Sequence, residues 1–165
     1  MEKYQAQKKR ILEFGNVLSY VFHVNHDILD KYEITDGVIN EDVVDFSPTI
    51  QYDLIISIVT LPEVGWYEGK RDHMKTLSAI NNLKRILAPG GQVVLALGLG
   101  YNTEMDALLR SDTIHFDKRY YLKRISGHRW QEVSSLEDIK DLKYDYSIPT
   151  ANGVLIGVIE KKQDE

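Results

Sequence analysis

Residues 52–97 read YDLIISIVTLPEVGWYEGKRDHMKTLSAINNLKRILAPGGQVVLAL, and this stretch decides the fold. Continuous apolar runs at 52–59 and 92–99 are typical of strands that are buried on both faces of a sheet. Between them, apolar side chains recur at spacings of three or four across 72–87, which predicts one amphipathic helix. The Pro-Gly-Gly turn at 89–91 ends this helix before the next strand begins. A strand, a helix and a strand in this order predict a right-handed crossover between parallel strands.

Similar runs lie on either side of this unit, at 10–14, 26–32 and 153–160. The interval between the first two runs is long enough for one helix. Repetition of the crossover predicts an α/β fold, a doubly wound and mostly parallel sheet with helices on both faces. Residues 113–125 and 153–160 have no clear helix between them, so we expect an antiparallel C-terminal edge strand.

The composition is that of one compact domain, which we expect to span 1–165. Because the chain has no Cys, it cannot form a disulfide, a thiolate zinc site, an iron–sulfur cluster or a cysteine nucleophile. The five His residues lack metal-ligand spacing and the acids form no calcium loop, so we expect no metal. The apolar runs are too short for a membrane span and the N-terminal residues do not resemble a signal peptide, which together predict a cytoplasmic protein.

A formal net charge of −5 argues against a general nucleic-acid partner. The basic and aromatic stretch at 118–130 has two readings, an RNA-binding surface or an alternating strand with one solvated face. The acidic chain as a whole favours the second. We therefore expect a small-molecule substrate and neither nucleic acid nor membrane as partner, while exposed sheet edges leave a homodimer open.

Ligands of open α/β sheets bind beyond the carboxyl ends of the strands, which directs attention to a few residues. The first strand ends at Glu13, and Gly15 permits a close backbone approach. Asn16 follows and can cap a helix or adopt an unusual backbone conformation. By itself this segment is equally consistent with a plain turn between a strand and a helix.

Two further acidic residues lie beside the next predicted strands, one after the second strand and one before the third. Asp30 can accept hydrogen bonds from both hydroxyls of a ribose, although a solvated loop acid would look the same. Asp42 precedes the strand-like residues 43–46 and can accept a hydrogen bond from the exocyclic amine of an adenine. Asp45 is an equally available acceptor by chemistry alone.

Taken together, these segments resemble class I S-adenosylmethionine-dependent methyltransferases, from about residue 10 to residue 160. The resemblance rests on the order of the three acidic positions, on YDLIISIVTLPEVG at 52–65, and on ILAPGGQVVLAL at 86–97. It implies a Rossmann-like methyltransferase fold and S-adenosylmethionine as cofactor. The cofactor-binding candidates that it implies are Glu13, Gly15 and Asn16 near the methionine part, Asp30 at the ribose, Asp42 at the adenine, and Ser57 in the fourth strand.

The resemblance implies methyl transfer to a small or sugar-like acceptor. The sulfonium donor already carries an activated methyl group, so the protein mainly aligns the two reactants and excludes water. Glu63 and His73 flank the expected position of the methyl group and are the candidate bases, with Glu63 preferred. Trp66 and Tyr67, together with Tyr101 and Asn102 after the fifth strand, are the candidate substrate-binding residues.

Two other functions stay open. Val17 and Ser19 stand where a glycine-rich loop would have glycines, so the chain can also be a catalytically silent interaction protein on the same fold. A nicotinamide-dependent Rossmann-type enzyme is the third possibility, but the two glycines of GLGYN at 98–102 do not form the three-glycine fingerprint that opens a dinucleotide-binding unit. An open cleft between Asp30 and Gly98 favours the enzyme, whereas side chains filling the space above Gly15 favour the silent protein.

Overall fold

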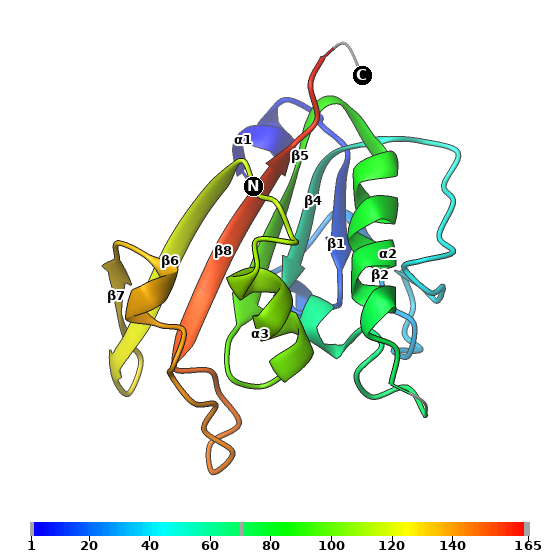
Figure 1. Ribbon diagram of the computed structural model, residues 1–165. Coiled ribbons are helices and arrows are strands. Elements are labelled where there is room, and N and C mark those ends of the chain that lie inside the picture. The colour runs from blue at the N-terminus through cyan, green and yellow to red at the C-terminus, as the bar shows by residue number, and fades with distance from the viewer. Residues whose placement is uncertain (1, 70, 164–165) are drawn as a thin grey trace.

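The computed structural model describes residues 2–69 and 71–163, without the side chains of Glu2, Gln5 and His73. Figure 1 shows one twisted sheet with helices packed against it. In chain order the elements are α1 (Glu2–Ala6), β1 (Ile11–Phe14), η1 (Leu18–Tyr20), β2 (Asp27–Leu29), β3 (Val38–Ile39), β4 (Tyr52–Ile58), η2 (Leu61–Glu63), α2 (His73–Arg85), β5 (Leu87–Gly98), α3 (Thr103–Arg110), β6 (Lys118–Ser126), β7 (Arg129–Val133), η3 (Leu136–Asp138) and β8 (Gly153–Glu160).

The sheet has the strand order β3-β2-β1-β4-β5-β8-β6-β7. Within the first five strands of this order, β3-β2-β1-β4-β5, all neighbouring strands are parallel. β8 lies between β5 and β6 and is antiparallel to both. This arrangement confirms the predicted class, a doubly wound and mostly parallel sheet with an antiparallel C-terminal region. The hairpin partner β7 was not predicted, and it places an additional strand at the outer edge.

The core forms where α2 packs on the central strands. Ile55 of β4 and Leu95 of β5 are fully buried, as are Ala79 and Leu83 on one side of α2. Asp72 caps this helix, because its carboxylate accepts a hydrogen bond from the Met74 amide at 3.0 Å. The predicted helix between the two strands is therefore confirmed, and it fixes the position of the chain on either side of β4.

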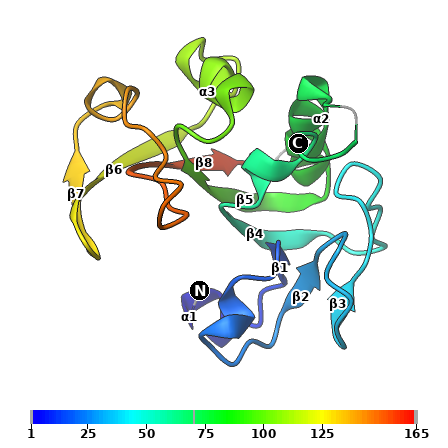
Figure 2. The same cartoon turned by 90° about the horizontal axis from the view of Figure 1, so that it is seen from below.

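Helical cover differs between the two faces of the sheet. Figure 2 shows α2 and α3 on one face, with the short α1 on the other. The helix expected between β1 and β2 is instead the single 3-10 turn η1, which has no buried residue to pack as an amphipathic helix would. No helix in the described ranges is long and apolar enough to cross a membrane.

The strand expected at 43–46 was also misplaced. The third strand is Val38–Ile39, and 43–45 forms a turn closed by a bond from the Phe46 amide to the Asp42 carbonyl at 2.9 Å. Asn82 of α2 holds this turn, because its side-chain amide donates to the carbonyls of Val43 and Phe46. These bonds place Asp42 near α2. A strand at 43–46 would instead have placed it along the sheet.

Candidate functional site

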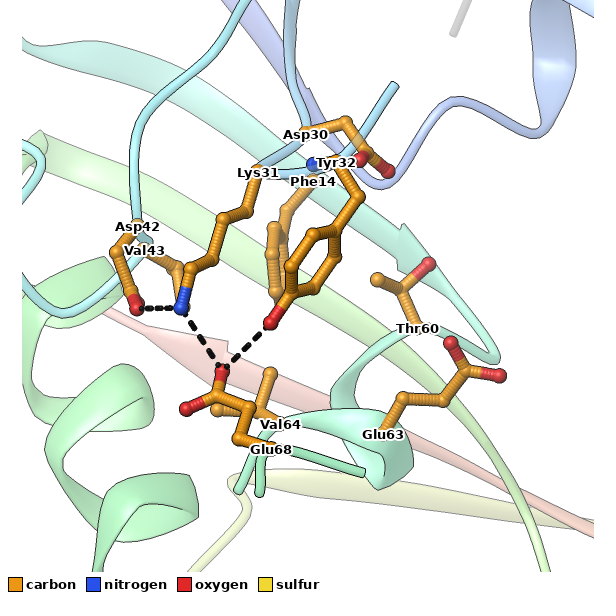
Figure 3. A pocket seen from close by; sticks show the side chains of 10 residues that line it. All are labelled: Phe14, Asp30, Lys31, Tyr32, Asp42, Val43, Thr60, Glu63, Val64 and Glu68. Carbon is orange, nitrogen blue, oxygen red and sulfur yellow. Dashed lines mark hydrogen bonds and ion pairs between the residues drawn. The ribbon is translucent and has the colours of Figure 1, made fainter. Parts of the chain in front are cut away.

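A cleft lies beyond the carboxyl ends of β1, β2 and β4. Its volume is about 70 Å³, and Figure 3 shows its side chains. The lining residues come from β1, the loops after β2 and β3, and the segment around η2: Phe14, Asp30, Lys31, Tyr32, Asp42, Val43, Thr60, Glu63, Val64 and Glu68. Two of the three predicted acids, Asp30 and Asp42, therefore share one cleft, at the edge of the sheet where this class of fold binds ligands.

Asp30 is held at the end of β2 by its own loop. Its Oδ1 accepts hydrogen bonds from the amides of Tyr32 and Glu33, both at 2.9 Å. These two bonds orient the carboxylate at the cleft while leaving the acceptor capacity of Oδ2 for a ligand. The position is suited to accept the hydroxyls of a ribose.

Asp42 belongs to an ion-pair cluster with Lys31, Glu68 and Lys75. Its Oδ2 lies 2.9 Å from Lys31 Nζ and 2.6 Å from Lys75 Nζ. Glu68 bridges the same two ammonium groups, and Figure 3 shows Lys31 extending between Asp42 and Glu68. Burial alone would raise the pKa of Asp42, but the hydrogen bonds from Lys75 and Lys31 outweigh it and lower the pKa to about 2.

Glu13 does not line the cleft. It is fully buried, and its Oε1 accepts hydrogen bonds from the amides of Val17 and Leu18 at 2.8 and 2.7 Å. Its Oε2 lies 2.9 Å from Nε2 of His26, whose side chain is also buried. Glu13 therefore anchors the loop that follows β1. The three predicted acids do not converge in one trench, because this one faces its own loop and His26.

The loop after β1 is closed over Gly15. This residue has a φ of +87°, and a side chain there would overlap the Thr60 side chain. Asn16 donates to Glu33 Oε1 at 2.6 Å and accepts from the Ser19 hydroxyl. Ser57 is buried inside β4 and does not line the cleft. In this conformation the candidates for the methionine part of the cofactor, together with Ser57, form no binding site for an amino-acid group. These candidates are Glu13, Gly15 and Asn16.

Glu63 lies at the other end of the cleft from Asp42, beside Thr60 (Figure 3). Partial burial raises the pKa of its carboxyl, and the carboxylate of Asp30 raises it further. A raised pKa favours proton uptake from an acceptor group, as general base catalysis requires. The other candidate base, His73, begins α2, but its side chain lies outside the described residues.

The predicted substrate-binding residues lie next to Glu63 but differ in availability. Tyr67 is 69% exposed, and its ring centroid lies 5.8 Å from that of Tyr101. The Trp66 ring is covered by Arg71, whose guanidinium carbon lies 4.0 Å from the ring centroid. Asn102 is buried and caps α3, and its side-chain amide donates to the Pro62 carbonyl at 2.7 Å. These bonds give Asn102 a structural role.

The site also contains residues that sequence reasoning missed. Lys31, Tyr32, Thr60, Glu68 and Lys75 all contribute to the cleft or to the ion pairs at its mouth. Lys31 is the only one of the five with a local signal, since it follows Asp30 directly. The pairing of Lys75 with Asp42 joins residues 33 positions apart, which no local pattern indicates.

Three solved structures that are similar to this chain are described as methyltransferases. The N-methyltransferase NodS of Bradyrhizobium japonicum WM9, solved with S-adenosyl-L-homocysteine, superposes with a TM-score of 0.57 at 16% identity, over 93% of this chain and 78% of that one. A methyltransferase of Thermotoga maritima, described as a possible histamine N-methyltransferase, gives 0.53 at 14% identity, over 97% and 88%. A putative methyltransferase of Thermoplasma acidophilum gives 0.50 at 15%, over 93% and 68%. No protein-family model matches the chain, and no curated protein does.

Proposed function

Given that the chain has the class I S-adenosylmethionine-dependent methyltransferase fold, we propose that its cleft binds S-adenosylmethionine and that it transfers the methyl group to a small-molecule acceptor. The observation that carries this proposal is the position of Asp30 and Asp42, which line one cleft at the carboxyl ends of β2 and β3. Carboxylates in these two places suit the ribose hydroxyls and the adenine amine.

The residues present fit the adenosine part of the cofactor. Asp30 offers its carboxylate to the ribose, Asp42 can receive the adenine amine, and Val43 and Val64 supply apolar walls. The cleft volume of about 70 Å³ is small beside the roughly 300 to 1,000 Å³ of small-molecule pockets. Binding of the whole cofactor therefore requires Thr60 and the segment after Gly15 to separate.

Glu63 is the residue that we assign to proton removal. It faces the cleft beside Thr60 and has a raised pKa, so its carboxylate can take the proton that an acceptor loses when it is methylated. The bound cofactor supplies the activated methyl group. In this assignment the walls of the cleft exclude water, and the acceptor approaches over Tyr67 and Tyr101.

A second function, an interaction protein without catalysis, is favoured by one specific observation. Thr60 fills the space above Gly15, and Glu13 is withdrawn from the cleft by His26. If these contacts persist in solution, the methionine part of the cofactor has no place to bind. Such a protein would take up adenosine at most.

Calorimetric titration separates the two functions. S-adenosylmethionine, S-adenosylhomocysteine and adenosine are titrated into the protein, each up to millimolar concentration. The methyltransferase binds both sulfur compounds more tightly than adenosine, because the methionine part adds contacts. An interaction protein without catalysis would give equal binding heats for adenosine and S-adenosylhomocysteine, or no binding heat for either. Either result would refute the proposed function.

A further inference from the structure

Four tyrosines form a continuous cluster beyond the cleft. Tyr67 follows η2, Tyr101 follows β5, and Tyr144 and Tyr146 lie in the loop before β8. Successive ring centroids are 5.8, 5.1 and 5.0 Å apart, and all three pairs are tilted or edge-on. Segments from three parts of the chain therefore present aromatic rings on one surface, which we call the tyrosine cluster.

The cluster adjoins the cleft through Glu63. Tyr67 follows Glu63 by four residues, and the carbonyl of Pro62, next to Glu63, accepts a hydrogen bond at 2.7 Å from the side-chain amide of Asn102, the neighbour of Tyr101. The Glu63 carboxylate also raises the pKa of both Tyr101 and Tyr144. Figure 3 places Glu63 beside Thr60, at the end opposite to the ion pairs of Asp42. A group resting on the tyrosine rings would therefore lie next to the end of the cleft where we place the transferred methyl group.

The electrostatics of this surface favour a cation. The faces of aromatic rings carry negative potential and attract ammonium groups, with more energy where water is excluded. Among the side chains that the structure describes, which do not include those of Lys70 and His73, no lysine, arginine or histidine forms an ion pair with Glu63. Burial raises the pKa of Tyr101, and its phenol stays neutral. Within the described side chains, the Glu63 carboxylate thus has no cation partner and lies close to neutral rings.

The ring faces are accessible. Tyr67 and Tyr146 are 69% and 71% exposed, while Tyr101 and Tyr144 are half-buried between them. A sugar could also stack on such rings, but it would leave the carboxylate of Glu63 without a charge partner. An ammonium group satisfies the rings and the carboxylate together.

We propose that Glu63 and the tyrosine cluster bind the cationic head of an organic amine, and that this amine is the class of acceptor. Because an ammonium nitrogen has no lone pair, it would first give one proton to the Glu63 carboxylate, and the neutral nitrogen would then form the bond to the methyl carbon as the bond from that carbon to the donor sulfur breaks. The second half rests on the proposed function, because an acceptor requires a methyl donor in the neighbouring cleft. The first half, a binding site for organic ammonium ions, stands on the geometry of Glu63, Tyr67, Tyr101 and Tyr144.

The test uses choline and its uncharged carbon analogue 3,3-dimethylbutan-1-ol, which have nearly the same shape. Each is titrated by NMR into the full chain without any methyl donor. We expect choline to bind at millimolar concentration and the neutral analogue to bind at least ten times more weakly, because it loses both cation–π attraction and the ion pair. Equal affinities, or no binding of choline, would overturn the inference.

Three substitutions locate the site. Glu63→Gln and Tyr101→Leu should each weaken choline binding at least fivefold, whereas Tyr101→Phe keeps the ring and should retain most of the affinity. Tyr120→Leu is the matched control, an exposed tyrosine on β6 outside the cluster. Thermal unfolding checks that each variant is folded. Unchanged affinity in both Glu63→Gln and Tyr101→Leu would place choline elsewhere and refute the inference.

The test of the ammonium site and the test of the proposed function can fail independently. Protein that binds S-adenosylhomocysteine but not choline contradicts the amine site alone. Protein that binds choline but not S-adenosylhomocysteine contradicts methyl transfer, and it leaves the ammonium site standing as a binding site.

Discussion

The side chain of Thr60 occupies the space in which a side chain at residue 15 would lie, so Gly15 and Thr60 are in direct packing contact across the ends of β1 and β4. Gly15 also has a φ of +87°, which disfavours any other residue. Two independent constraints thus act on one position. They can be separated by comparison with another glycine.

The comparison uses Gly15→Ala and Gly37→Ala. Gly37 has a φ of +86° but nothing within 4 Å of an added Cβ, so its substitution reports backbone strain alone, about 1 to 2 kcal/mol of unfolding free energy. Gly15→Ala should cost that amount plus about 1 to 3 kcal/mol for displacing Thr60. Urea denaturation measures both. Equal costs would show that Thr60 moves away freely.

Asp42→Asn should change how stability depends on pH. The folded pKa of about 2 lies below the ordinary value of 3.8, so the ionised carboxylate stabilises the fold above about pH 4, and this contribution is lost as the pH falls toward 2. The difference in unfolding free energy between wild type and variant should therefore shrink by at most about 2 kcal/mol over this interval. Urea denaturation between pH 2.5 and 7 measures it.

Asp36→Asn is the control for that series, because Asp36 is an exposed carboxylate in the turn before β3. Its effect should be small and nearly constant with pH. A difference between wild type and Asp42→Asn that stays constant down to pH 2.5 would show that Lys31 and Lys75 do not hold Asp42 ionised.

Glu13→Ala should destabilise the protein by about 3 kcal/mol, since it removes a buried carboxylate and leaves two partly buried amides and the buried His26 side chain without their acceptor. Glu13→Gln keeps a carbonyl oxygen for the amides of Val17 and Leu18 and should cost less. Amide hydrogen exchange provides the local readout. Exchange at Val17 and Leu18 should accelerate in the alanine variant, and unchanged rates there would contradict the anchoring role.

Asp30→Asn should weaken the binding of S-adenosylhomocysteine about tenfold, equivalent to about 1.4 kcal/mol, with little change in thermal stability. Oδ1 of the asparagine can still accept from the amides of Tyr32 and Glu33, so the loop is retained while the charge is lost. Calorimetry with adenosine and 2′-deoxyadenosine supplies the ligand control. If Asp30 binds the ribose, the substitution penalises adenosine more than the deoxy compound.

The parallel strands and α2 could be predicted because their signals are local. Apolar periodicity marks residues 72–87, where α2 is found. The Pro-Gly-Gly segment was expected to separate this helix from the next strand, but α2 ends at Arg85 and β5 already begins at Leu87 and includes residues 89–91. The cleft acids Asp30 and Asp42 were found by their positions next to predicted strands, and Asp30 directly follows β2 as expected. For Asp42 the position was nearly right for the wrong reason: β3 precedes it, whereas a strand was expected after it.

The remaining features depend on partners distant in sequence. Glu13 was expected at the cofactor, but its orientation is set by His26, thirteen residues later. The closure over Gly15 depends on Thr60, which a different strand supplies. The sequence of residues 17–24 does not show that the expected helix shortens to η1. In the structure Val21 and Phe22 are exposed, so no apolar side chain packs a longer helix against the sheet. Local propensity is a weak guide where the tertiary contacts decide.

The bond from Asn102 to the Pro62 carbonyl has a mechanical consequence. It fastens the segment with Thr60 and Glu63 to the first turn of α3, and α3 in turn is seated on the core by Met105 and Leu109. That side of the cleft is therefore held in place by the core. The segment after Gly15 is held by bonds from the amides of Val17 and Leu18 to Glu13 and from the Ser19 and Tyr20 hydroxyls to Asn16 and Glu33, and η1 has no buried residue. Admission of a larger ligand should therefore displace this segment while the side with Glu63 keeps its alignment.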